Sequence, residues 1–508
     1  MVSNEVFVGA NAQVGIAPEV DMFLNAMTRT SDTVLTLHSS ATSVYLLVEG
    51  LYVGCTIKLT ADGSTASPTY YTITANTTTT ITVDSTIVPA SGTIDGTILS
   101  FGAPCYGPKN GTAGTILSDN WVGLLNTFTP PNVEVEMKQL NLAAAGGRNF
   151  DFQYKGAETV SGGSLELSLN NGSWLYYALG KITSLSEDGA DTAVAGTNAK
   201  NVMAYNTSNK NIVRSIGNNL YPEFADGADE AAGNTVNILP TGTKFTYTFG
   251  EADDDVLPSF ALDVAYRKGG HSSTTTLDAL TPHENMYSRI FTGCQVNSLT
   301  LNFEEGQELT SSVELVTRRA FDAPNGYLPL RGKNTLAATT NTSATEAGLI
   351  NFSATDADNY PFLFSDGSIT LFGQTVARVK SGSITISNNL TPQRFIGNYN
   401  RQIVSAHLPA QRTYEISLTM LITDTKLWEE LRTDAESTGS LKVEFTKSGG
   451  EKISLEFADY LINSVTIPFP EDKGAVEAEV AAQARTLTAA SYIGKWAIPT
   501  LGGTATGN

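Results

Sequence analysis

Gln295-Val-Asn-Ser-Leu-Thr-Leu-Asn-Phe303 is written a second time near the end of the chain, as Leu461-Ile-Asn-Ser-Val-Thr-Ile-Pro-Phe469. Both stretches place Asn, Ser, Thr and Phe at the same positions, with aliphatic residues before the Asn and on both sides of the Thr. Their asparagines, Asn297 and Asn463, lie 463 − 297 = 166 residues apart. Alternation of apolar and polar residues is typical of a strand with one buried face. The agreement indicates an internal duplication.

Further elements recur around this strand in the same order. Residues 133–138 match 376–386, residues 164–169 match 414–420, and residues 311–316 match 476–480. A short helix is predicted in each copy, around Trp174 and Trp428, which are 428 − 174 = 254 residues apart. Copy one therefore holds 254 − 166 = 88 extra residues. Segments 182–242 and 268–292 have no counterpart in copy two and supply 86 of them, so we expect both to be surface insertions.

Cap residues mark the ends of the two predicted helices. In copy one, Asn171 or Ser173 is the candidate N-cap and Gly180 the stop signal. In copy two, Asp424 is the candidate N-cap. Each Trp is expected to anchor its helix to the sheet.

The remaining chain divides by composition. Short alternating runs between 33 and 108, separated by Gly and Asn residues, predict a small inserted β-domain. The expected organisation is an all-β chain with little helix, made of the following parts: an N-terminal segment 1–32 that docks on copy one, the inserted domain 33–108, copy one 109–325, a connector 326–369, copy two 370–487 and a C-terminal arm 488–508.

Charge and cysteine content narrow the classes of function. A net charge of −20 over 508 residues argues against gripping nucleic acid phosphates, which requires arrays of Lys and Arg. It is compatible with a surface past which DNA slides, and equally with simple solubility. The three cysteines have no metal-site or disulfide-framework spacing, which favours a reducing compartment. With no apolar run of membrane length and no signal-peptide pattern, we expect a soluble, non-secreted chain.

Motifs for catalysis and cofactor binding are missing from the sequence. The four histidines have no metalloprotease spacing, and no Gly-x-Ser-x-Gly elbow occurs. The acid runs 253–255 and 356–358 lack the glycine of an EF-type calcium loop and are interpreted as solvated turns. We therefore expect no enzyme activity, no cofactor and no metal.

The segments that recur in order resemble phage major tail tube proteins. The resemblance rests on Ser381-Gly-Ser-Ile-Thr-Ile-Ser-Asn-Asn-Leu390, the strand 414–420, the Leu427-Trp428 helix and the stretch from Asn463 to Arg485 in copy two. In copy one it rests on Ser173-Trp-Leu-Tyr-Tyr-Ala-Leu-Gly180 and on 293–303. Together these parts cover about 300 residues of the chain.

The resemblance implies two tandem β-sandwich tube domains, each with one flanking helix. Six such domains form a ring, so three copies of this chain would make a pseudo-hexameric ring, with a six-chain ring as the less favoured alternative. Stacked rings would form the conduit through which DNA passes without specific binding, with other tail proteins at the tube ends. The location would be the virion tail, after assembly in the host cytoplasm, and the domain 33–108 would lie on the tube exterior.

Two groups of residues are candidate functional sites. Glu304, Glu305, Glu471 and Asp472 follow the duplicated strand at equivalent places; they are interpreted as exposed hairpin turns, or as an acidic ring on the wall of the tube. By the resemblance, segment 389–412 would contact the next ring, and its apolar character independently calls for a cover. The candidate contact residues are Phe395, Tyr399, Ile403, His407 and Leu408.

Two other classes of function compete with the tail tube. A baseplate, fibre-type or surface protein could use residues 33–108 to bind carbohydrate, although the segment is poor in aromatic residues. A glycan hydrolase would need a carboxylate pair in a cleft, and the sequence offers no means of choosing one.

Overall fold

The computed structural model describes residues 7–19, 22–37, 47, 49–61, 68–88, 93–104, 123–142, 148–187, 213–216, 219–222, 245–252, 257–268, 286–322, 360–372, 374–376, 378–395, 404–422, 429, 431–432, 440–468 and 474–494. Within these ranges the regular structure is almost entirely β-strand, and α1 (Ser173–Leu179) is the one named α-helix. The prediction of an all-β fold with little helix is confirmed.

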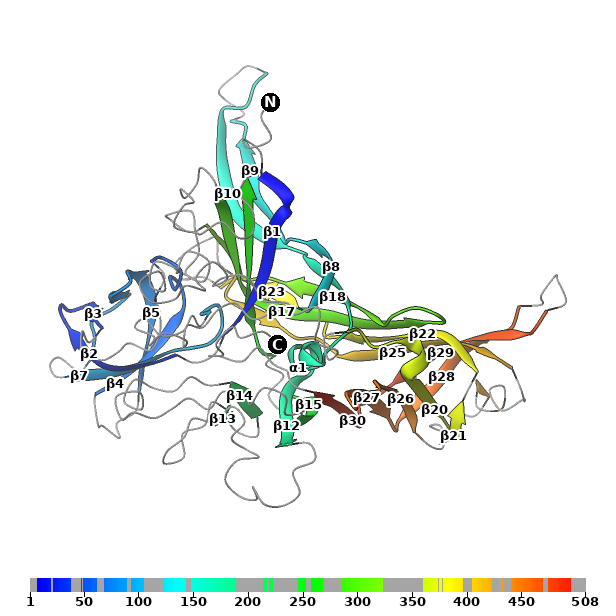
Figure 1. Ribbon diagram of the computed structural model, residues 1–508. Coiled ribbons are helices and arrows are strands. Elements are labelled where there is room, and N and C mark those ends of the chain that lie inside the picture. The colour runs from blue at the N-terminus through cyan, green and yellow to red at the C-terminus, as the bar shows by residue number, and fades with distance from the viewer. Residues whose placement is uncertain are drawn as a thin grey trace.

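One sheet of eleven strands runs through both copies of the duplicated unit (Figure 1). Three of its strands, β1 (Phe7–Pro18), β16 (Phe260–Lys268) and β19 (Arg319–Asp322), attach at its middle, where β16 and β19 pair with β17. The other eight form a continuous path. In spatial order they are β28 (Tyr460–Thr466), β29 (Glu477–Ala484), β25 (Thr413–Leu421), β22 (Val379–Ser387), β17 (Met286–Glu304), β18 (Thr310–Val316), β11 (Ser164–Ser168) and β8 (Leu124–Thr129).

The strand order repeats the duplication. Copy two supplies β28-β29-β25-β22 and copy one supplies β17-β18-β11-β8, so each set begins with the Asn-Ser strand. In both sets the ladder to the next strand is interrupted at the asparagine, Asn297 in β17 and Asn463 in β28. The shared bulge shows that the two sequences fold into the same local geometry.

The first strand of copy one is not the one expected from the sequence. β8 pairs with β11 as β22 pairs with β25, so β8 takes the place that the sequence analysis gave to residues 133–138. Those residues belong to β9 (Asn132–Leu140), which forms a hairpin with β10 (Phe152–Ser161). Because Leu124 and Leu125 are adjacent and polar residues follow them, β8 lacks the clear period-two pattern of a half-buried strand.

A second sheet of seven strands covers the large one. It also crosses both copies, in the order β12 (Gly180–Glu187), β15 (Phe245–Glu251), β30 (Ala489–Gly494), β27 (Lys452–Phe457), β26 (Leu441–Thr446), β20 (Gly367–Leu371) and β21 (Gln374–Val376). Aromatic pairs join the two layers, with 5.5 Å between the ring centroids of Phe303 and Phe445 and 5.7 Å between those of Tyr414 and Phe457. The apolar residues between the sheets form a single core that belongs to both copies.

The helix of copy one lies where the sequence predicts it. Trp174 is buried and its ring meets that of Phe260 at a centroid distance of 5.6 Å, so it anchors α1 as expected. Gly180 ends the helix with a left-handed backbone. Gly172 is the N-cap, while the Asn171 side chain accepts a hydrogen bond from the Ser173 N–H. In copy two, Glu429 and Leu431 are helical, but Asp424 and Trp428 lie outside the described residues.

The inserted domain is a closed six-stranded barrel. Its strands, in order around the barrel, are β2 (Met22–Arg29), β3 (Val34–Thr36), β6 (Thr80–Val83), β5 (Thr69–Asn76), β4 (Thr56–Ala61) and β7 (Thr93–Ile98). The barrel includes β2, whose residues the sequence analysis grouped with the N-terminal segment. Its core continues into copy one through Ala261, Ile290 and Phe321. The barrel is therefore packed directly on the large sheet.

Other segments differ from their expected roles where they are described. The ends of the two expected insertions form part of β12 and of β17. The start of the expected C-terminal arm is β30, which lies between β15 of copy one and β27 of copy two. Two smaller antiparallel pairs complete the fold: β13 (Val213–Ile216) with β14 (Asn219–Pro222), and β23 (Thr391–Gln393) with β24 (Ala406–Leu408).

Candidate assembly interface

The two copies are joined by a strand pair that we call the seam. β17 of copy one and β22 of copy two pair antiparallel over seven residue pairs, from Ser298 with Ser387 to Glu304 with Ser381. On the outer side of this pair the Thr300 and Thr385 hydroxyls are 3.0 Å apart. The seam thus shows, inside one chain, how one repeat adds to the next.

Asn297 connects the two motifs that the sequence singled out. Its backbone carbonyl accepts the Asn388 N–H at 2.7 Å, and its side-chain oxygen accepts the Leu390 N–H at 2.8 Å. Asn388 in turn donates from its side-chain amide to the Val296 and Ala178 carbonyls. The duplicated asparagine therefore receives the Asn-Asn-Leu segment of the following repeat. A bulge makes this possible, because it removes Asn297 from the ladder to β18.

Charged groups close one end of the seam. Arg412 Nε donates to the Asn388 side-chain oxygen at 2.7 Å, and a guanidinium nitrogen of Arg412 lies 3.7 Å from Glu251 of copy one. The Tyr414 hydroxyl donates to the same carboxylate. Burial, followed by the bond to Glu251, raises the pKa of Tyr414 above its usual range, so this hydroxyl stays protonated as a donor.

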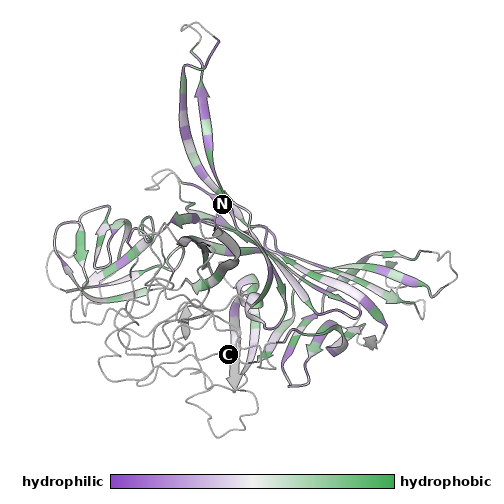
Figure 2. Ribbon diagram, turned by 45° about the horizontal axis from the view of Figure 1, so that its top comes forward, coloured by the Kyte–Doolittle hydropathy of each residue, from purple (hydrophilic) through white to green (hydrophobic). Residues whose placement is uncertain are grey.

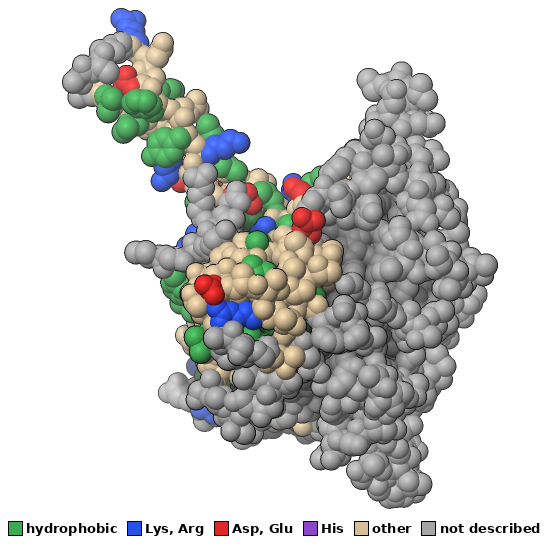
Figure 3. Space-filling model, turned by 90° about the vertical axis from the view of Figure 1, so that its left-hand side faces the viewer, with side chains coloured by type: hydrophobic (Ala, Val, Ile, Leu, Met, Phe, Trp, Pro, Cys, Tyr) green, Lys and Arg blue, Asp and Glu red, His purple; other side chains and the backbone are tan. Residues whose placement is uncertain are grey.

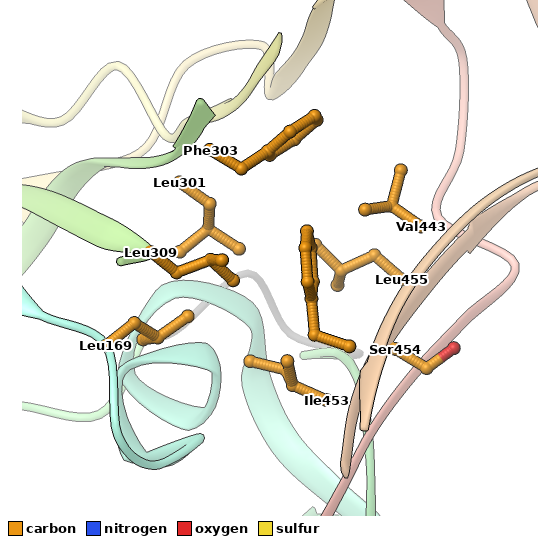
Figure 4. Close-up of a pocket in the computed structure, with 9 residues that line it drawn as sticks. Leu169, Leu301, Phe303, Leu309, Val443, Ile453, Ser454 and Leu455 are labelled. Carbon is orange, nitrogen blue, oxygen red and sulfur yellow. The ribbon is translucent and has the colours of Figure 1, made fainter. Parts of the chain in front are cut away.

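Beneath the seam lies a small apolar cavity between the two sheets (Figure 4). Phe303 extends into the core here, and its ring occupies the space beside Gly382, where a Cβ atom would come within 2.5 Å of it. Eight other residues from both copies line the cavity: Leu169, Leu301, Leu309, Val443, Phe445, Ile453, Ser454 and Leu455. The packing of the seam is therefore shared by both repeats.

Phe303→Ala is expected to lower the free energy of unfolding by about 3–5 kcal/mol, because it enlarges this cavity and removes the contact with Phe445. Urea denaturation measures the change. Phe152→Ala is the matched control: this ring is 57% exposed, and its loss is expected to cost less than about 0.5 kcal/mol. Equal losses in the two variants would contradict the assigned role of Phe303.

Within the described part of the chain, the path of the large sheet ends at β28 on one side and at β8 on the other. These are the same two kinds of strand that pair at the seam, since β28 repeats β17 and β8 repeats β22. Burial reflects the difference: Leu299 of β17 is fully buried, whereas Val465, its counterpart in β28, is only half-buried. In the strands that the structure describes, these two edges are therefore complementary and unpaired.

The solvent-facing side of the large sheet is acidic. Alternate residues of its strands point away from the core and are mostly Ser, Thr and Glu. Hydrogen bonds from Ser298 to Glu314 and from Ser312 to Glu166 tie neighbouring strands on this side. Lys380, beside this surface, is paired with Glu477 at 2.5 Å. The acids of the surface are Glu166, Glu304, Glu314, Glu415, Glu477 and Glu479.

The first predicted site is placed only for copy one. Glu304 ends β17 and Glu305 follows it in the turn, where the Glu305 N–H donates to the Lys380 carbonyl at 2.8 Å; both side chains are exposed. Glu471 and Asp472, their counterparts, lie outside the described residues.

The predicted inter-ring segment is divided by the structure. Phe395 and Leu408 are about half exposed, but His407 is buried against copy one, where its Nδ1 lies 2.8 Å from the Gln295 side-chain oxygen. Its ring also meets Phe101 of the barrel edge-on, at 5.4 Å. Tyr399 and Ile403 lie outside the described residues. His407 therefore acts as an internal contact.

A buried polar cluster fixes the barrel to the tandem body. The Glu19 carboxylate accepts the Gly102 N–H at 2.8 Å and the Gly293 N–H at 2.7 Å. Arg318 donates to the Gly54 carbonyl at 2.7 Å and to the Val404 carbonyl at 3.2 Å. Burial raises the pKa of Glu19 to about 7 despite these donors, and it lowers the pKa of the nearby His407 to about 4. No sequence pattern predicts this cluster, because its members are far apart in the chain.

Glu19→Gln is expected to change the pH dependence of stability. The folded-state pKa lies above the ordinary 4.5, so between about pH 4.5 and 7 the folded protein holds a proton that the unfolded chain releases. This carboxyl therefore loses stabilising effect as the pH rises. The stability of the wild type minus that of the variant should fall by about 3 kcal/mol between pH 4 and 8. His407 titrates in both proteins and cancels; a difference constant with pH would refute the assignment.

The β9–β10 hairpin is a surface that the sequence analysis did not identify. It projects from the body and carries apolar residues toward its outer end (Figures 1 and 2). Met137, Leu140, Phe152 and Tyr154 are each about half exposed. Period-two alternation in 133–138 is the visible signal for one strand of this hairpin, although the sequence matches the segment to 376–386 of copy two.

These features define a tandem-repeat β-sandwich protein whose large sheet is open at two complementary edges. The model of the family described as phage tail tube protein matches residues 111–484, and the chain belongs to that family. A search of curated proteins found no match. Membership makes this a structural protein of the virion tail that associates with itself and with other tail proteins. Among the described residues, no helix is long and apolar enough to cross a membrane.

Proposed function

We propose that three copies of this chain close into a ring and that such rings stack into the tail tube. The observation that carries the proposal is the seam, because the pairing of β17 with β22 is an interface between repeats already made in one chain. Pairing β28 of one chain with β8 of the next repeats it. Since the two edges differ, the contact is head-to-tail and closes only through rotation into a ring.

Three chains give six repeats in this arrangement. The internal and external junctions are not identical, because Pro130 and Pro131 directly follow β8 and neither can donate a main-chain hydrogen bond. Around the ring, three seams within chains would therefore alternate with three weaker junctions between chains. One barrel per chain gives three barrels per ring, and its attachment beside Arg318 and Phe321 supports a place on the outside of the tube.

The acidic side of the large sheet is proposed to line the lumen. Carboxylates such as Glu304, Glu314 and Glu415 would repel DNA phosphates, so the genome passes without being held. The role is structural rather than catalytic. Assembly is proposed to occur in the host cytoplasm, with other tail proteins ending the tube.

The mass and shape of the purified chain test this proposal. Light scattering should give a species of three chains, and negative-stain microscopy should show rings with a central hole, singly or stacked. A monomer that persists at high protein concentration would refute it. Rings of six chains would retain the tube but reject the closure proposed for β28 and β8.

A further inference from the structure

The short β23–β24 hairpin of copy two, which we call its arm, shows how such a hairpin packs against the preceding repeat. This arm, β23–β24, lies against copy one, where His407 contacts Gln295 and the Val404 N–H and carbonyl bond to the Arg318 carbonyl and Nε, both at 3.2 Å. His407, Gln295 and Arg318 are all buried. We call the surface formed by Gln295 and Arg318 the seat of copy one.

Copy two has an equivalent seat, and its residues are exposed. Strand register places Ser298 opposite Glu314 and Ser464 opposite Ala481. Counted from these pairs, Leu461 matches Gln295 and Arg485 matches Arg318. Gln295 is 5% exposed, whereas Leu461 is 46% exposed. The Arg485 side chain is 68% exposed and pairs with Asp459 on the surface.

Copy one has the matching arm, which is longer. Ser164 of β11 and Ser417 of β25 occupy the same register on β18 and β29. Tyr154 and His407 each lie ten residues before that pair, so Tyr154 holds the position of His407. Tyr154 is 53% exposed, and its pairing partner Lys138 places it on the same face as Phe152 and Leu140. Figure 3 shows hydrophobic side chains, in green, along the projecting hairpin.

We infer that the β9–β10 hairpin of one chain lies on copy two of a second copy of this chain, with Tyr154 over Leu461 and beside Arg485. The inference rests on the proposed ring. A chain cannot fill its own seat, because β28 and β8 lie at opposite ends of the sheet path. Tyr154 and Leu461 are chemically suited to each other, because an aromatic ring covers an exposed leucine. At the seat of copy one, the corresponding pair is His407 and Gln295.

The β23–β24 arm and the β9–β10 arm differ in apolar content, because different groups cover the seat on which each one lies. Phe101 of the barrel caps His407 within the chain, and Arg318 donates to the Gly54 carbonyl of the barrel. Nothing in the described part of copy two corresponds to the barrel. The β9–β10 arm therefore supplies its own apolar cover, through Phe152 and Leu140 next to Tyr154.

Cysteine cross-linking tests the contact. A chain with Tyr154→Cys and Leu461→Cys should, on mild oxidation of assembled rings, give covalent dimers and trimers on a non-reducing gel. Each single variant should remain a single chain. The control pairs Tyr154→Cys with Leu408→Cys, which is 48% exposed but on the other arm. Rings that form without the Tyr154–Leu461 link, or that link through Leu408 instead, overturn the inference while the proposed function stands. A chain that forms no rings overturns both.

A second variant tests how strongly Tyr154 contributes to ring formation, without a new covalent bond. Tyr154→Asp should raise the protein concentration needed for ring formation by about tenfold or more, as expected for an aromatic anchor at an interface. Its melting temperature as a monomer should match the wild type, because the side chain is exposed. Tyr70→Asp, on the barrel and 59% exposed, should change neither quantity. An equal effect of the two variants on assembly would also reject the contact.

Discussion

A chain carrying Val465→Pro is expected to fold and to remain a monomer under conditions in which the wild type forms rings. Hydrogen bonds at the seam show which groups face outward: the Asn297 carbonyl and the Glu305 N–H both point to β22. Residues on a strand alternate in direction, so Leu299 of β17 also faces β22. Val465 repeats Leu299, and its N–H therefore points to the open edge. Proline removes that donor without touching the pairing of β28 with β29.

The control for this variant is Val465→Thr, which keeps the N–H and the β-branched shape. Light scattering should show the wild-type mass for the Thr variant and a single chain for the Pro variant, with similar circular dichroism for both. Rings formed by the Pro variant at wild-type concentration would show that β28 is not the closing edge. Loss of folded structure in the Pro variant would show that the Val465 N–H donates to an acceptor within its own chain.

Arg318→Ala is expected to lower the free energy of unfolding by about 3–5 kcal/mol. The side chain is 4% exposed and bonds to carbonyls of the barrel and of the copy-two arm, so its loss leaves buried acceptors and Glu19 without their cation. Because these acceptors belong to separate parts of the fold, the barrel should also unfold at a lower denaturant concentration than the body. Denaturation followed by fluorescence and by circular dichroism would reveal the two steps.

The duplication supplies the control for Arg318. Arg485 is the same residue at the equivalent place in copy two, but its side chain is 68% exposed and pairs with Asp459 at the surface. Arg485→Ala in the monomer should cost at most about 1 kcal/mol. Comparable losses for the two arginines would contradict this assignment. They would show that the burial of Arg318 does not increase its contribution to stability.

The family, the all-β class and the repeat were recoverable from the sequence because each is recorded in local pattern. Asn297 and Asn463 mark equivalent bulges, and the helix at Trp174 was predicted from its spacing and its glycine stop. Strand β30 was missed, since Ala489-Ala-Ser-Tyr-Ile-Gly494 has few large apolar residues. β2 was separated from its barrel because closure of a barrel depends on pairing with β7, about seventy residues away.

What the sequence by itself determined is therefore the unit: the strands with clear alternation, the buried face of each of them, and the fact that the unit occurs twice. Periodicity contains this information because burial repeats with the strand geometry of each segment. The tertiary structure alone decided how the units meet. The seam, the buried place of His407, the exposed Tyr154 and the two open edges all depend on which strands become neighbours. That choice is made by contacts between distant parts of the chain, and no local pattern encodes it.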